Sequence, residues 1–257
     1  DVYKRQLQVL AGKRYGYEPQ QVLDTAQKLY EEKLTSYPRS DAEYLPVSQH
    51  KDAAKILGNL TALPDTPLAA WVQAADPAKK SRAWNDAKIS AHHAIIPTTV
   101  PVNLARLTAM ERNIYELIAR AYIAQFCPNY VYDQTRAEVT HHGETFTVRG
   151  RTERTAGWRT MYRTGKNESE DAEKEDEESA VLPPMKKGDA AAFVSAEMKE
   201  RQTKPPARFT PATLLQGMKE IHKYVKDEAA KKMLRDVSGI GTEATRASII
   251  EDLIRRK

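Results

Sequence analysis

The apolar residues in the first half of the chain recur at the spacing of helices. A helix is predicted from Pro19, a residue that suits the first helical position, to about Glu32. Its apolar face would carry Val22, Ala26, Leu29 and Tyr30. A second helix is predicted from Ser48, a candidate N-cap, to about Gly58. Residues 7–127 are therefore expected to form a helical region.

The clearest helix signal lies at Thr108. Glu111 follows three residues later, so the two side chains can form a capping box at a helix start. The apolar residues that follow at helical spacing are Ile114, Leu117, Ile118, Ala121 and Tyr122. This pattern predicts a long amphipathic helix that ends near Pro128.

The pattern changes after Pro128, where Val, Thr and Tyr alternate with polar residues. Residues 130–140 and 144–149 are predicted strands, and the His-His-Gly sequence between them predicts a hairpin turn. A further strand is predicted at residues 157–163. Two Pro-Pro pairs, at 183–184 and 205–206, mark boundaries further along the chain.

A helical pattern returns near Phe209. Thr210 is predicted to cap a helix that begins at Pro211. A Gly-Ile-Gly-Thr turn at residues 239–242 precedes a last helix, whose apolar residues are Ile249, Ile250 and Leu253. The order of helical, β and helical regions predicts a mainly α protein with a β segment, of the α+β class.

Composition excludes several classes of protein. Among the 257 residues there is no run of about 18 apolar positions, which excludes a membrane-spanning helix. The single cysteine, Cys127, excludes a disulfide scaffold and a multi-thiolate zinc site. No signal peptide is visible, so a cytoplasmic protein is expected. Residues 1–6 show no period and are expected to be a scar of non-native sequence.

The net charge of +5 is unevenly distributed. Between Glu168 and Glu178 eight acidic residues face one lysine, which gives −7, so the remaining chain carries 5 − (−7) = +12. Residues 166–180 are expected to form a solvated, disordered insert. The basic remainder fits either a polyanion partner or a Lys- and Arg-rich surface, and charge alone favours neither. The chain lacks a phosphate-binding G-x-x-x-x-G-K-[ST] motif, so ATP use is not expected.

The most informative stretch surrounds Tyr37. Pro38 favours an extended Tyr37, and residues i and i+2 of extended chain point the same way, so Tyr37 and Arg39 should share a face. A guanidinium there can favour the phenolate and bind a phosphate, and Asp41 can orient it. For the Tyr37–Pro38 pair alone, a half-buried tyrosine before a turn proline is the simpler interpretation.

Residues 29–41, with the sequence L-Y-E-E-K-L-T-S-Y-P-R-S-D, resemble the active-site segment of the type IA DNA topoisomerases, and the match is similar to the topoisomerase III branch. Residues 90–98 resemble the A-H-x-A-I-x-P-T segment of that family, which makes His92 the histidine that approaches the scissile phosphate. Residues 239–250 resemble the family segment G-I-G-T-x-A-T-R-A-x-I-I. Residues 206–214 resemble P-x-R-[YF]-T-E-A-T-L, with Pro211 where the family commonly has Glu.

The resemblance implies single-strand DNA cleavage and religation through a 5′-phosphotyrosine, which changes DNA topology by relaxation or decatenation. Tyr37, Arg39 and His92 would be catalytic, with Asp41 in support. The residues expected to contact single-stranded or melted DNA are Ser36, Arg208, Thr242, Thr245 and Arg246. The location would be the nucleoid of a bacterial cytoplasm.

The resemblance also implies a division of the chain and a missing part. Residues 7–127 would form the helical domain that carries Tyr37, residues 128–204 an arm of a β arch, and residues 205–257 part of a helical DNA-binding base. The family holds Mg²⁺ on acidic residues of a separate N-terminal domain, whose motifs this sequence lacks. The isolated chain is therefore expected to have little or no relaxation activity.

Four other interpretations can be set beside this one. The chain could be a single-stranded DNA-binding module that does not use its tyrosine. A rolling-circle relaxase needs two histidines separated by one apolar residue, a spacing that the adjacent pairs at 92–93 and 141–142 lack. The same adjacency disfavours a zinc site on these four histidines. A helix at residues 242–256 that reads duplex DNA would leave the Tyr37 segment unexplained.

Overall fold

The computed structural model describes residues 4–40, 42–63, 66–89, 91–163, 182–192, 194–195, 200, 202–203, 205, 207–237, 239–242 and 245–256. Asp41 and the expected acidic insert at 166–180 lie outside these residues. The chain divides into two compact units, one of residues 1–127 and 209–257 and one of residues 128–208. Each unit is described separately.

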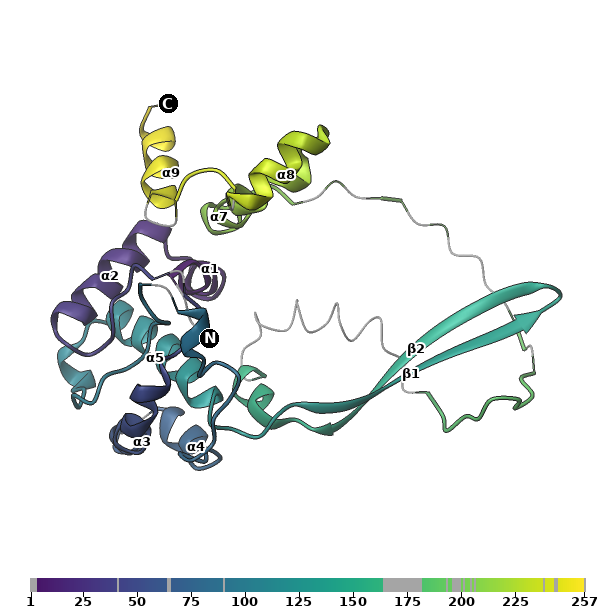
Figure 1. Ribbon diagram of the computed structural model, residues 1–257, viewed down its shortest axis with the longest axis horizontal. Coiled ribbons are helices and arrows are strands. Elements are labelled where there is room, and N and C mark those ends of the chain that lie inside the picture. Colours follow the sequence, from purple (N-terminus) through teal and green to yellow (C-terminus); the bar gives the residue numbers. More distant parts are fainter. Residues whose placement is uncertain are drawn as a thin grey trace. The chain divides into compact units, whose positions relative to one another are not determined.

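The first unit is helical (Figure 1). Its helices before the division are α1 (Lys4–Tyr15), α2 (Pro19–Glu31), α3 (Ala53–Thr61), α4 (Leu68–Val72) and α5 (Ala109–Ala124). Those after it are α7 (Pro211–Lys219), α8 (Glu228–Asp236) and α9 (Arg246–Arg255). Short 3₁₀ turns lie at η1 (Val47–Asp52), η2 (Asp86–Lys88), η3 (Leu104–Arg106) and η5 (Ile221–Tyr224). The predicted mainly helical character is confirmed.

The core of the first unit is built on α5, which packs against α1, α2 and α4. Thr108 and Glu111 form the predicted capping box, so this helix begins where the sequence places it. The buried side chains of α5 include Ile114, Tyr115, Leu117, Ile118, Tyr122 and Ile123. Burial raises the pKa of the Tyr115 and Tyr122 phenols, so both hydroxyls stay protonated at neutral pH.

Helices α7 and α9 pack on this part of the unit, α7 against α1 and α9 against α2. A Cβ at Gly12 of α1 would lie 2.8 Å from the Ala212 Cβ of α7, so only glycine permits this close approach. Thr210 caps α7 and Pro211 begins it, as predicted. Helix α1 begins at Lys4, within the stretch 1–6 in which the sequence predicts no periodic structure.

The helix predicted from Ser48 is wrong at its start. Residues 47–52 form the 3₁₀ turn η1, and α3 begins only at Ala53. The difference follows from hydrogen bonds made by the residues just before this helix. Leu45 is bonded to the 83–85 segment, and the Val47 amide donates to the Asp86 carboxylate at 2.9 Å. These bonds turn the chain more tightly than an α-helix would.

The second unit contains the predicted hairpin, formed by β1 (Val131–His141) and β2 (Glu144–Thr155). The strands are antiparallel with Val139 opposite Phe146. His142 and Gly143 have φ values of 49° and 86°, which suit the two-residue turn of a twisted hairpin.

The strand predicted at 157–163 is wrong, because residues 157–162 form the 3₁₀ turn η4 (Gly157–Tyr162). Gly157 has φ 51°, and a Cβ there would meet the Pro128 and Asn129 carbonyls at 2.4 Å. The Trp158 amide donates to the Pro128 carbonyl at 3.0 Å. The chain therefore turns back toward residues 128–129, which precede the hairpin, instead of continuing as a strand.

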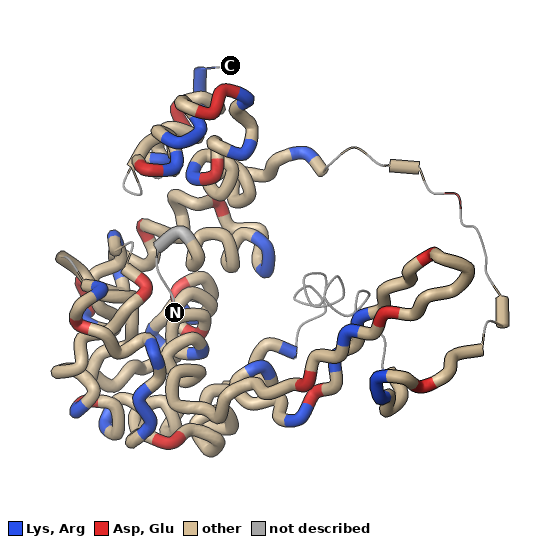
Figure 2. The backbone as a smooth tube through the Cα atoms, turned by 45° about the vertical axis from the view of Figure 1, so that its right-hand side comes forward, with Lys and Arg blue, Asp and Glu red and all other residues tan. Residues whose placement is uncertain are grey.

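Lys and Arg residues are spread over the helices and the hairpin alike, with acidic residues between them (Figure 2). The positive net charge therefore does not by itself locate a DNA-binding face. In the described part of the chain, no helix is long and apolar enough to cross a membrane.

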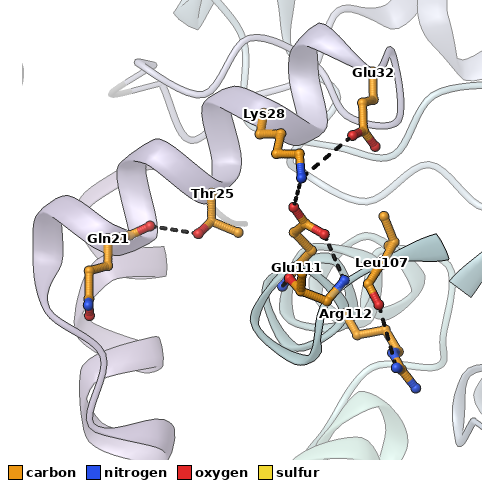
Figure 3. A network of polar contacts seen from close by, with 8 residues as sticks. Gln21, Thr25, Lys28, Glu32, Leu107, Glu111 and Arg112 are labelled. Carbon is orange, nitrogen blue, oxygen red and sulfur yellow. Dashed lines mark hydrogen bonds and ion pairs between the residues drawn. The ribbon is translucent and has the colours of Figure 1, made fainter. Parts of the chain in front are cut away.

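An ion pair joins α2 to α5 (Figure 3). The Lys28 ammonium on the last turn of α2 donates to the Glu111 carboxylate, which also accepts from the Thr108 amide at 2.7 Å. The hydrogen bond from Lys28, with that from Thr108, lowers the pKa of the Glu111 carboxyl. Glu111 thus caps one helix and holds the end of another, next to the segment that carries Tyr37.

We expect Glu111→Gln to destabilise the first unit by about 1 kcal/mol near pH 7, because it removes the charge from this cap. A carboxyl whose pKa is lowered on folding contributes stability above its unfolded pKa and loses it as the pH falls through the folded pKa. The difference in free energy of unfolding from the parent, measured in urea, should therefore shrink as the pH is lowered from 7 toward 3. Glu251→Gln, at an exposed position of α9, serves as the control, and an equal loss there would contradict the role of Glu111.

Candidate active site

The Tyr37 segment leaves α2 through a defined helix end. The Lys33 amide donates to the Tyr30 carbonyl at 2.8 Å, and the Leu34 amide donates to the Leu29 carbonyl at 2.9 Å. This pair of bonds is a Schellman motif, with Lys33 at φ 62° in the left-handed position that glycine usually takes. The motif ends the helix abruptly, just before the segment that carries Tyr37 and Arg39.

Hydrogen bonds hold residues 34–36 against residues 94–98, a pairing that we call the clip. The Ser36 amide donates to the Ile96 carbonyl at 2.9 Å, and the Thr98 amide donates to the Leu34 carbonyl at 3.0 Å. The Ser36 hydroxyl accepts from the Ile96 amide at 3.0 Å and lies 3.3 Å from the Ala94 carbonyl. Two stretches that the sequence singles out separately are thereby held side by side, and the Ser36 hydroxyl serves this clip.

The clip brings Tyr37 and His92 together. Their rings are stacked with centroids 4.7 Å apart and planes inclined by 27°. The Tyr30 ring meets Tyr37 edge-on at 5.6 Å. Tyr37 is half-buried between these two rings, while His92 is exposed. The phenol is thus held in place beside an imidazole that solvent, or a phosphate, can reach.

Arg39 is exposed. Among the described residues no hydrogen bond or ion pair fixes its guanidinium, and Asp41, expected to orient it, lies outside them. The neighbouring Ser40 is fully buried, and its hydroxyl accepts from the Ala42 amide at 3.2 Å. The backbone on either side of Arg39 is therefore held while the charged side chain projects into solvent.

Arg246, which the sequence predicts to contact DNA, is bonded to its own backbone turn in this structure. This side chain is only 2% exposed, and its guanidinium donates to the Ile240 and Gly241 carbonyls, each at 2.9 Å. These bonds hold the glycine turn before α9. Thr242 and Thr245 are exposed, with hydroxyls 3.0 Å apart. The two threonines, unlike Arg246, remain accessible to a ligand.

Arg208 is the last residue of the second unit and is exposed. Because the two units are described separately, its side chain is not placed relative to Tyr37. Its expected contact with DNA stays a prediction from the sequence.

Two features of the site are absent from the predictions. Tyr30 is predicted as part of the apolar face of α2, yet its ring packs on Tyr37, a contact that its seven-residue separation and the Schellman turn make possible. The second is the pair Gln49–His93, whose side-chain nitrogens lie 3.1 Å apart. No local pattern marks Gln49, because its partner lies 44 residues away.

Metal ligands are a separate question. Within the described ranges, no three or more His, Cys, Asp and Glu side chains lie close enough together to hold a metal ion. The His141 and His142 rings meet at the hairpin turn with centroids 4.2 Å apart. Burial raises the pKa of the Cys127 thiol, which keeps it protonated.

Comparison with known proteins agrees with this site. The family model described as DNA topoisomerase matches residues 3–257. The chain is 41% identical to DNA topoisomerase 3 of Vibrio cholerae and of Pasteurella multocida, over 97% of its own length in each case. It is 37% identical to DNA topoisomerase 3 of Bacillus subtilis over 96% of its length. The chain spans only 38%, 37% and 34% of these three relatives, respectively. A family match over nearly every residue shows that the chain belongs to the type IA DNA topoisomerases, in their topoisomerase III branch.

Proposed function

We propose that the chain carries the nucleophile of an enzyme that cuts and rejoins one strand of DNA. The observation that carries this proposal is the stack of Tyr37 on His92, held by the clip between residues 34–36 and 94–98. A tyrosine fixed beside an exposed imidazole, at the end of a capped helix, is preorganised for attack on a phosphodiester.

The reaction exchanges one phosphodiester for another. The Tyr37 oxygen forms a bond to phosphorus and loses its proton, while the bond from phosphorus to the 3′ oxygen breaks and that oxygen gains a proton. The 5′-phosphate then stays on Tyr37, and attack by the 3′-hydroxyl reverses the step. Because one ester replaces another, no nucleotide cofactor is needed.

The proposed roles of the neighbours follow from their placement. His92 faces the Tyr37 ring and is exposed, so it can reach the phosphate or the developing charge. Arg39 is exposed two residues from the nucleophile and can bind a phosphate oxygen. Asp41 is proposed to support Arg39. Arg208, Thr242 and Thr245 are proposed DNA contacts, whereas Ser36 and Arg246 are assigned to holding the backbone.

The complete enzyme is proposed to need Mg²⁺ and more chain than this sequence contains. The Mg²⁺ site is assigned to the N-terminal domain of the family, as the resemblance implies. Residues 7–127 are proposed as the tyrosine-bearing domain, 128–204 as an arm of the arch and 205–257 as part of the base. Single-stranded or melted DNA in the nucleoid is the proposed substrate, with relaxation or decatenation as the outcome.

The test is the identity of the DNA fragment that becomes attached to protein. Single-stranded DNA labelled at its 3′ end should give a labelled covalent adduct after denaturation, whereas DNA labelled at its 5′ end should not, because Tyr37 retains the 5′-phosphate. The reaction is run with Mg²⁺ and with the N-terminal domain of a relative added as a separate chain. No adduct with that domain present, together with retained DNA binding, would leave a non-catalytic single-stranded DNA-binding module as the function.

A further inference from the structure

A pocket lies next to the nucleophile and takes no part in the mechanism above. It has a volume of about 190 Å³, and its lining includes Ser36 and His93, the sequence neighbours of Tyr37 and His92. Tyr37 and His92 themselves do not line it. Ser36 and His93 each adjoin one residue of the tyrosine–histidine stack, so the pocket lies beside that stack. A DNA strand held at Tyr37 would pass close to its mouth.

The lining suits a nucleobase better than a phosphate. Ile56, Ile96 and Pro97 supply apolar walls, and none of the described lining residues is Lys or Arg. The Asp52 carboxylate in the lining would repel a phosphate. Pockets that hold whole drug-sized ligands are roughly 300–1,000 Å³, so this smaller volume suits one base and not a complete nucleotide.

The hydrogen-bonding character of the pocket follows from His93. Its Nδ1 lies 2.7 Å from the Ala94 carbonyl oxygen, an acceptor, so Nδ1 carries the proton. In the neutral ring Nε2 then accepts, and the Gln49 amide group must present its NH₂ to it at 3.1 Å. This fixes the orientation of the amide. The Gln49 Oε1 oxygen is left buried, with no partner among the described residues.

Asp52 supplies an acceptor to the lining of the pocket. It occupies the N-cap position of α3, but its side chain makes no cap hydrogen bond, so helix capping does not account for the carboxylate. It is half-buried and lines the pocket. The Asp52 side chain is therefore an acceptor in the lining, and it calls for a donor on the ligand.

We propose that this pocket binds one base of the DNA strand near the scissile bond, and that it favours bases with an exocyclic amine over thymine. Asp and Glu accept from the amino group of cytosine in known base readout, and the amines of adenine and guanine offer the same donor. Thymine lacks an exocyclic amine: its one ring N–H lies between two carbonyl oxygens, which the Asp52 carboxylate repels. The proposal rests on the proposed function for bringing DNA to Tyr37, and it adds a preference among cleavage sites.

The test is equilibrium binding of the chain to labelled single strands of about 12 nucleotides, a length within the usual site sizes of single-stranded DNA binding. Oligodeoxycytidine and oligodeoxyadenosine should bind about tenfold more tightly than oligothymidine. In Asp52→Asn, whose amide both donates and accepts, the preference should fall to within about twofold. Asp24→Asn removes the same charge from an exposed position of α2 and should leave the preference unchanged.

A second variant guards against a folding defect in the first. Thr99 lines the pocket, so Thr99→Leu should fill it and erase the base preference without changing any charge. Thermal melting of each variant at the parental temperature shows that the first unit stays folded. A base preference that survives in both Asp52→Asn and Thr99→Leu would overturn the proposal.

The two proposals fail in different ways. Binding without base preference, combined with a covalent adduct on Tyr37, would overturn the pocket alone. A preference that persists in Tyr37→Phe while no adduct forms in the parent would support the pocket and overturn the cleavage function. Absence of binding to every oligonucleotide would overturn both.

Discussion

Replacing Tyr37 by phenylalanine should reduce covalent adduct on 3′-labelled DNA to below about one thousandth of the parental amount, because the attacking oxygen is gone. The ring itself is kept, so the stack on His92 and the edge contact from Tyr30 should persist. The measurement is the labelled band that survives denaturation, with the N-terminal domain of a relative present. Binding of single-stranded DNA should change little.

Tyr30→Phe is the matched control. It removes a phenol oxygen from the adjacent ring without removing the ring, and we expect most of the adduct to remain. If Tyr37→Phe still formed an adduct, or if Tyr30→Phe abolished it, the nucleophile would have to be a different residue from Tyr37.

The second large effect is expected at Leu29, whose side chain is fully buried where α2 packs on α5. Leu29→Ala should lower the free energy of unfolding by about 2–5 kcal/mol, because it removes buried apolar atoms and leaves a cavity. The Leu29 carbonyl also accepts the bond that closes the Schellman motif. The variant should therefore lose adduct yield more steeply with temperature than the parent does.

Leu253→Ala makes the same chemical change on α9, where the side chain is 63% exposed. Its unfolding free energy should change by less than about 0.5 kcal/mol. Urea denaturation followed by circular dichroism measures both variants. Similar losses at the two positions would show that the α2–α5 contact does not hold the first unit together.

The parts of the fold predictable from the sequence are those whose cause is local. The capping boxes at Thr108 and Thr210 are complete within four residues, and the hairpin turn depends on His142 and Gly143 alone. The errors arise where a residue far away in the sequence determines the local backbone conformation. Residues 157–162 turn because of the Pro128 carbonyl, and the start of α3 is delayed because Asp86 holds Val47.

The same division applies to the site. Pro38 predicts an extended Tyr37. The contact of Tyr37 with His92 was predictable only through the family resemblance, since 55 residues separate the two. The sequence could not show that the Arg246 guanidinium donates hydrogen bonds to the Ile240 and Gly241 carbonyls. An arginine near a predicted phosphate site looks the same in the sequence whether its guanidinium contacts DNA or the backbone of its own turn.

The adjacent histidines at 92 and 93 have a consequence for errors in pairing. Residues 34–36 and 94–98 pair in one register, marked by the bridge from Thr35 to Pro97. A slip of one residue in an extended segment exchanges the sides on which its side chains lie. Here a slip in one direction would bring His93 to the position of His92, whereas a slip in the other direction would bring Ala91 there. The pairing register of residues 34–36 with residues 94–98 therefore decides which side chain faces Tyr37 and which lines the pocket.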